Sequence, residues 1–121
     1  MSHPSRSFPH HRLDAYRVAL ELAGQAKDLA DSVPRGYRSI SDQLLRAATS
    51  TVLLIGEGAS RYGPGLKRQR YREALGECGE VAAALELLVH LRLADARRVD
   101  EALGLAIRVQ AMLTGLARRF S

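Results

Sequence analysis

The chain has 121 residues, enough for one domain with a single hydrophobic core but not for two. Its one cysteine excludes an intrachain disulfide and any metal site built from several thiolates. The formal net charge of +5 favours polyanionic partners such as RNA, DNA or an acidic protein. Nearly all of the cations are arginines, however, and an arginine-rich proteome would produce that excess without any such partner.

The N-terminal segment differs from the rest of the chain. Residues 1–11 are rich in Ser, Pro and His without a hydrophobic period, so we expect a flexible leader before one domain at residues 12–121. The leader has no apolar run typical of a secretory signal, and the longest such run, residues 52–55, is too short to cross a bilayer. We therefore expect a cytoplasmic protein with no membrane partner.

The first two helices are predicted from apolar periodicity. Residues 12–32 carry two adjacent apolar stripes, as in a helix that packs on two neighbours, before a Pro-Arg-Gly sequence interrupts them. A second helix is expected over residues 39–61, with Ser39 as N-cap and Asp42 close to completing a capping box. Gly56 and Gly58 each destabilise this helix by about 1 kcal/mol relative to Ala, which close approach of another helix would explain.

The last two helices follow a Gly-Pro-Gly loop. A third helix is expected over residues 67–93, with a small-residue strip at Gly76, Gly79 and Ala83 that would admit a close neighbour. Its predicted core seam, in which Cys78 is a buried structural thiol, consists of Tyr71, Leu75, Cys78, Ala82, Leu85 and Val89. A fourth helix should begin after the N-cap Asp95, with a seam of Ala102, Leu105, Val109, Met112, Leu116 and Phe120. Four amphipathic helices with short connections predict an all-α, antiparallel up-down-up-down four-helix bundle.

Catalytic and metal-binding arrangements are absent from the sequence pattern. A di-iron bundle needs Glu-x-x-His pairs, but His90 is the only histidine outside the leader and Leu stands three residues before it. Glu73, Glu77 and Glu80 line one side of the third helix, which is more typical of a solvated or ion-paired face than of acid–base catalysis. We expect no catalytic residue, no metal, no cofactor and no enzymatic activity.

A basic cluster follows the second helix and suggests a contact surface for nucleic acid. Arginine binds phosphate through two parallel hydrogen bonds and tyrosine stacks on exposed bases, which suits RNA or single-stranded DNA. Tyr62 and Tyr71 are interleaved with the cations, although Tyr71 also lies on the predicted seam. The alternative is that these cations pair with acidic residues of a neighbouring subunit. The candidate phosphate-binding residues are Arg61, Lys67, Arg68, Arg70 and Arg72.

A second polar pattern lies within the second helix. Arg46, Ser50 and Glu57 fall in a narrow stripe along one side of it. Arg46 and Glu57 are eleven residues apart, about three turns, so each needs a partner on another helix. Pairing between subunits would fix the register of an oligomer, which makes these three residues candidates for a subunit interface. Simple exposure to solvent is the alternative.

Several of these residues also carry a family resemblance. They are Gln43, Arg46, Ala47, Ala48, Ser50, Ile55, Glu57, Gly58 and Arg61 in the second helix, residues 71–76 (YREALG) and Glu80 in the third, and Met112, Leu113, Gly115 and Leu116 in the fourth. In these positions the chain resembles the bacterial four-helix bundle family first noticed as products of intervening sequences in 23S ribosomal RNA genes. It departs from the usual family pattern at Leu54, where Asn is common, at Thr51, where an aliphatic residue is common, and at Glu77, where Ser is frequent.

The resemblance implies a ring of bundles, typically a homopentamer, with no known catalytic activity. Similar bundles include the accessory proteins of diversity-generating retroelements, which partner a reverse transcriptase and carry a basic surface for nucleic acid. We therefore expect a non-enzymatic, oligomeric bundle that binds RNA or DNA, as an accessory to a nucleoprotein complex such as a retroelement reverse transcriptase. The alternative is a protein-interaction scaffold ring that binds no nucleic acid.

Overall fold

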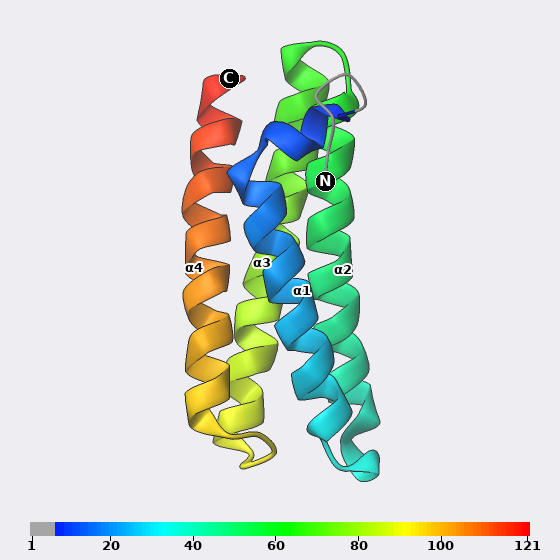
Figure 1. Ribbon diagram of the computed structural model, residues 1–121, viewed down its shortest axis with the longest axis vertical. Helices are drawn as coiled ribbons and strands as arrows, with labels where there is room; N and C mark the ends of the chain where they lie inside the picture. The colour runs from blue at the N-terminus through cyan, green and yellow to red at the C-terminus, as the bar shows by residue number, and fades with distance from the viewer. Residues whose placement is uncertain (1–6) are drawn as a thin grey trace.

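Four long helices make up the chain in a computed structural model that describes residues 7–121 (Figure 1). They are α1 (Asp14–Ser32), α2 (Arg38–Ser60), α3 (Pro64–His90) and α4 (Ala96–Arg119), with short 3-10 helices η2 (Pro9–Arg12) before α1 and η3 (Arg35–Tyr37) before α2. Successive helices run antiparallel, and α4 packs back on α1 to close the bundle. The predicted all-α, up-down-up-down four-helix bundle is confirmed. Residues 1–6 of the expected leader lie outside the described part, and Pro9–Arg12 of η2 lies beside α1 and α2.

The core runs the length of the bundle and draws on all four helices. Leu22, Ile55, Leu85 and Leu113 are each fully buried, one from each helix, and such burial stabilises the fold by about 1.5–3 kcal/mol per large apolar side chain. Between them lie many alanines, whose small side chains allow the helix backbones to approach closely. None of the helices within residues 7–121 is both long and apolar enough to span a membrane.

Three helix ends show how far local signals determine the boundaries. Asp95 caps α4 as predicted, and its carboxylate accepts a hydrogen bond from the Arg97 backbone N–H at 3.4 Å. In contrast, α2 begins at Arg38 because η3 leads directly into it, so Ser39 is not the N-cap. Helix α3 starts earlier than residue 67, because Pro64 is favourable in the first turn of a helix and Gly63 adopts the positive φ of 84° that precedes it.

The predicted seam of α3 is correct at three positions and displaced by one residue at three others. Helix α3 packs more extensively on α2 than on α4, which turns its core face toward α2. The buried positions are therefore Tyr71, Ala74, Cys78, Val81, Leu85 and Leu88, and the expected Leu75, Ala82 and Val89 are only partly buried. The strip of Gly76 and Gly79 faces away from the bundle, because a Cβ added at either glycine meets no atom within 4 Å. It does not accommodate another helix of the same chain.

Candidate nucleic-acid interface

The positive charge of the molecule is concentrated at one end of the bundle. The start of α1, the α2–α3 turn and the end of α4 all lie at the upper end in Figure 1. Residues 9–17, 57–73 and 115–121, which form this end, hold nine arginines and lysines against three acidic residues. That excess is larger than the net charge of +5 of the whole chain, so the rest of the molecule is close to neutral. We call these three segments the basic end.

Lys67 at this end is a structural residue. Its ammonium group donates hydrogen bonds to the backbone carbonyls of Gly58 at 3.1 Å and Ala59 at 2.8 Å. These carbonyls belong to the last turn of α2, where helical partners run out and the helix dipole favours a cation. Lys67 therefore caps α2, and it ties the first turn of α3 to the end of the preceding helix.

Two of the predicted phosphate-binding arginines are also engaged within the chain. Arg70 Nε lies 2.9 Å from Glu57 Oε2 on α2, and Arg70 Nη1 donates a hydrogen bond to Glu73 at 2.8 Å. These carboxylates, Glu73 first, raise the pKa of the Arg70 guanidinium above its ordinary value. Arg68 Nη1 donates to the Phe120 carbonyl at 3.4 Å, which connects α3 to the end of α4. Both arginines hold helices together.

Arg61 and Arg72 are the two predicted residues whose guanidinium groups remain available. Both are exposed, and within residues 7–121 neither side chain makes a hydrogen bond or ion pair. Tyr62, which follows Arg61 in the α2–α3 turn, is 92% exposed. The two free guanidinium groups can bind phosphate, and the exposed ring next to Arg61 can stack on a base. Tyr71, in contrast, is 2% exposed and belongs to the core.

Four further cations of the basic end were missed from the sequence: Arg12, Arg118, Arg119 and Arg17, the last of which is paired with Asp14. They are far from the α2–α3 turn along the chain, and only the fold brings them to the same end. A signal was present, because an antiparallel bundle of four helices necessarily places both chain ends beside the middle turn. Adding the charges at each end of the expected bundle would have found them.

Known proteins share both the sequence pattern and the fold of this chain. The family model of the 23S rRNA-intervening sequence protein matches residues 11–115 of the chain. The chain belongs to this family. A solved structure from Bacteroides thetaiotaomicron, described as a protein with unknown function from the S23 ribosomal protein family, is similar with a TM-score of 0.79. The two share 20% sequence identity over 86% of this chain and 95% of that one, a likeness that shows the fold alone. No curated protein matches the chain.

The polar stripe of α2 has its partners within the same chain. Arg46 Nη1 lies 3.3 Å from Glu77 and Nη2 lies 2.8 Å from Glu80, both on α3, and Nε donates to Gln43. Glu57 pairs with Arg70, and Ser50 is half-buried on α2. Each charge does have a partner on another helix, as the spacing required, but that helix is α3 of the same chain. Neither ion pair needs a second subunit.

Several of the residues that carry the family resemblance therefore lie at the contact between α2 and α3. Arg46 pairs with Glu80, Glu57 pairs with the neighbouring Arg70, and Gly58 lies against Tyr71. Glu77, one of the departures from the usual family pattern, adds a further ion pair to Arg46. In this chain these residues hold two helices in register, and that role needs no ligand.

The remaining reactive side chains that the structure describes do not cluster into a further site. Cys78 is buried, its thiol donates a hydrogen bond to the Ala106 carbonyl at 3.4 Å, and burial raises its pKa to about 11. A thiol of this kind is protonated at neutral pH and is a poor nucleophile. Within residues 7–121, no group of three or more His, Cys, Asp or Glu side chains lies together as metal ligands would.

Proposed function

We propose that this protein is a non-enzymatic, oligomeric bundle that binds RNA or DNA through its basic end. One observation carries the proposal: the basic end holds the whole positive excess of the chain, together with free arginine side chains and an exposed tyrosine. A charge excess gathered at one end supports a polyanionic partner better than a uniformly basic surface would, because it creates a local field that attracts phosphate.

The five cations first considered divide into two groups under this proposal. Arg61 and Arg72 would contact phosphates, and Tyr62 would stack on an unpaired base. Lys67, Arg68 and Arg70 would act indirectly, because their hydrogen bonds and ion pairs shape the turn that presents the other residues. The α2–α3 turn is thus the proposed centre of the nucleic-acid surface.

Filter retention of labelled single-stranded RNA and DNA at about 50 and 200 mM salt tests this assignment. Loss of two phosphate contacts in the double variant Arg61→Ala, Arg72→Ala should make the slope of log affinity against log salt shallower by about 1.4. The matched control is Arg35→Ala, Arg97→Ala, which removes the same charge at the opposite end, where both residues are exposed. Equal losses from both double variants would contradict a localised site.

Association into a ring, for which a pentamer is the family expectation, is supported by apolar side chains on the outside of the bundle. Leu53 on α2 is 67% exposed and Ile107 on α4 is 63% exposed, each on the outer face of its helix. Contacts between copies would cover such side chains. Light scattering should give a mass several times 13.3 kDa, and Leu53→Glu or Ile107→Glu should lower it. A monomer at micromolar concentration would contradict the ring.

The second candidate function is a scaffold ring that binds another protein and no nucleic acid. The intrachain partners of Lys67, Arg68 and Arg70 favour it, since they leave fewer cations for phosphate than the sequence suggested. A reverse transcriptase is one partner under either proposal, by analogy with retroelement accessory bundles. Nucleic-acid retention that is absent at both salt concentrations would favour the scaffold.

A further inference from the structure

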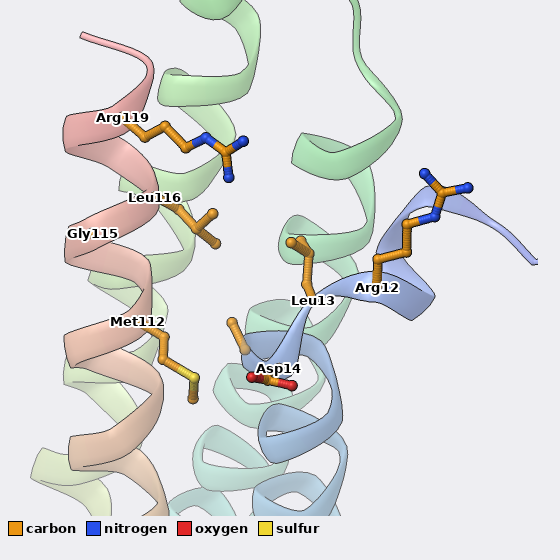
Figure 2. A pocket seen from close by; sticks show the side chains of 8 residues that line it. Arg12, Leu13, Asp14, Met112, Gly115, Leu116 and Arg119 are labelled. Atoms are coloured by element: carbon orange, nitrogen blue, oxygen red, sulfur yellow. The ribbon is translucent and has the colours of Figure 1, made fainter.

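A groove opens at the basic end between the start of α1 and the end of α4 (Figure 2). Two adjoining cavities of about 370 Å³ each form it, and both are lined by Arg12, Leu13, Leu116 and Arg119. In Figure 2, Met112 and Leu116 point from α4 into the gap that separates them from Leu13. The volume of each cavity is at the lower end of the range of about 300–1,000 Å³ found for ligand pockets.

The floor of this groove is apolar. Leu13 and Ala15 contribute from the N-terminal side and Met112 and Leu116 from α4. On α4, Gly115 lies between Met112 and Leu116. A Cβ added at Gly115 would meet no atom within 4 Å, so there is free space on the α4 side of the groove. Methionine adapts its shape to different apolar partners. Covering this apolar floor with another apolar side chain is favourable, because it removes apolar surface from water.

The rim of the groove is cationic. Within the described residues, neither Arg12 nor Arg119 lies within ion-pair distance of an acidic group. Asp14, the one acidic side chain among the lining residues, is paired with Arg17 instead. The Arg119 guanidinium lies 5.5 Å from the centre of the Phe120 ring, a contact that leaves its N–H groups free to donate. A ligand with an apolar anchor and a nearby carboxylate matches both parts of the groove.

The two aromatic rings that line the groove do not favour a nucleobase. Tyr71 is buried, and the Phe120 ring carries the Lys67 ammonium at 5.6 Å in addition to Arg119. A buried ring and a ring already in contact with two cations are poorly placed for base stacking, which provides much of the affinity for single-stranded nucleic acid. Burial of an aliphatic side chain needs no such face.

We propose that this groove binds an acidic segment of a partner protein. A side chain of the size of leucine or phenylalanine would occupy the space between Leu13 and Leu116, and a neighbouring carboxylate would pair with Arg12 or Arg119. Met and Arg are enriched at protein interfaces, as they are here. The groove reaches Ala59 and Lys67 beside the α2–α3 turn, but Arg61, Tyr62 and Arg72 do not line it. One bundle would therefore bind nucleic acid and a protein at two adjoining parts of the same end.

The test uses the full chain and a fluorescein-labelled peptide of about twelve residues, in which two leucines four positions apart are flanked by glutamates. Anisotropy should show saturable binding that weakens about tenfold or more in Gly115→Phe, because the new ring fills the apolar floor. The control is Gly104→Phe on the same helix, since Gly104 is also exposed with no atom within 4 Å of an added Cβ. It should bind the peptide as the unmodified protein does.

Other results would overturn the proposal. These are no saturable binding of the peptide, equal binding of its Gln-for-Glu version, or unchanged binding by Arg12→Ala, Arg119→Ala. A lower mass of Gly115→Phe in light scattering, without peptide binding by the unmodified protein, would assign the groove to a second copy of the chain. Loss of RNA retention in Gly115→Phe but not in Gly104→Phe would assign it to nucleic acid. RNA retention and peptide binding are separate measurements, so failure of one proposal is distinguishable from failure of the other.

Discussion

The ring of Tyr71 on α3 lies directly against the backbone of Gly58 on α2. A Cβ added at Gly58 would come within 2.6 Å of Tyr71 Cε1 and 2.9 Å of Cδ1, closer than carbon atoms can pack. The ring is 2% exposed, and its centre lies 6.0 Å from that of the Phe120 ring, so it has little room to move. This contact determines how closely α2 and α3 approach just before the turn that carries Arg61 and Tyr62.

Substitution of Gly58 should therefore destabilise the fold. We expect Gly58→Ala to lower the free energy of unfolding by about 1–3 kcal/mol, because the buried ring must shift. Gly56→Ala on the same helix is the matched control. It has open space for a Cβ and should raise the free energy of unfolding by up to about 1 kcal/mol through helix propensity. Urea unfolding of both variants provides the measurement, and equal values for the two would contradict the packing argument.

The two glycines also show what the sequence could predict about the fold. Apolar periodicity was sufficient for the helix number, the topology and most core positions, because an amphipathic helix must bury its apolar stripe. It could not show that Gly58 meets a ring and Gly56 meets nothing, since that depends on how α3 rotates against α2. The same rotation displaced the α3 seam at Ala74, Val81 and Leu88.

For the candidate site, composition identified a basic turn but could not assign a role to each cation. Arg72 and Arg70 are two residues apart in sequence, yet Arg70 reaches Glu57 on α2 and Arg72 projects away from the bundle. Met112 and Leu116 were expected in the core, but they line the groove because α1 and α4 leave a gap at this end. The role of each side chain depends on its contacts with residues far apart along the chain, and the sequence alone does not show these contacts.

Lys67 and Arg72 carry the same charge and should differ in their effects. Lys67→Ala removes the hydrogen bonds to the last turn of α2 and should lower the free energy of unfolding by about 1–2 kcal/mol. Arg72→Ala should change it by less than about 0.5 kcal/mol, because its side chain is exposed. Thermal unfolding followed by circular dichroism distinguishes them. A larger loss of stability from Arg72→Ala would refute the division of roles.

Thr51 is a fully buried polar residue whose hydroxyl we expect to contribute little to stability. Its Oγ1 donates a hydrogen bond to the Ala47 carbonyl at 2.8 Å, within α2 itself. Replacement by valine leaves no buried group unpaired, since this carbonyl retains its backbone partner, so we expect Thr51→Val to change the free energy of unfolding by less than about 1 kcal/mol. Thr51→Ser keeps the hydroxyl but loses the buried methyl group and should be less stable than Thr51→Val in urea. The opposite order would show that the hydroxyl matters more.

Cys78 should make the stability of the bundle depend on alkaline pH. Burial raises the pKa of its thiol from 9.0 to about 11, so the unfolded chain ionises at lower pH than the folded one. Because the folded pKa is the higher of the two, this contribution is complete below pH 9 and is lost as the pH rises toward 11. The loss is at most about 1.4 kcal/mol per pH unit. Alkylation of the folded protein at pH 8 should also be slow.

A comparison with Cys78→Ala isolates this effect, because tyrosines and lysines that titrate in the same range are common to both proteins. At pH 8 the unmodified protein should be the more stable one, since alanine leaves a small cavity where the thiol contacts α4. Between pH 9 and 11 that advantage should shrink, because only the unmodified chain gains an ionised thiol on unfolding. Urea unfolding at several pH values measures the difference. A constant difference over this range would mean that the thiol ionises equally well in the folded protein, and therefore that water reaches the α3–α4 seam at Cys78.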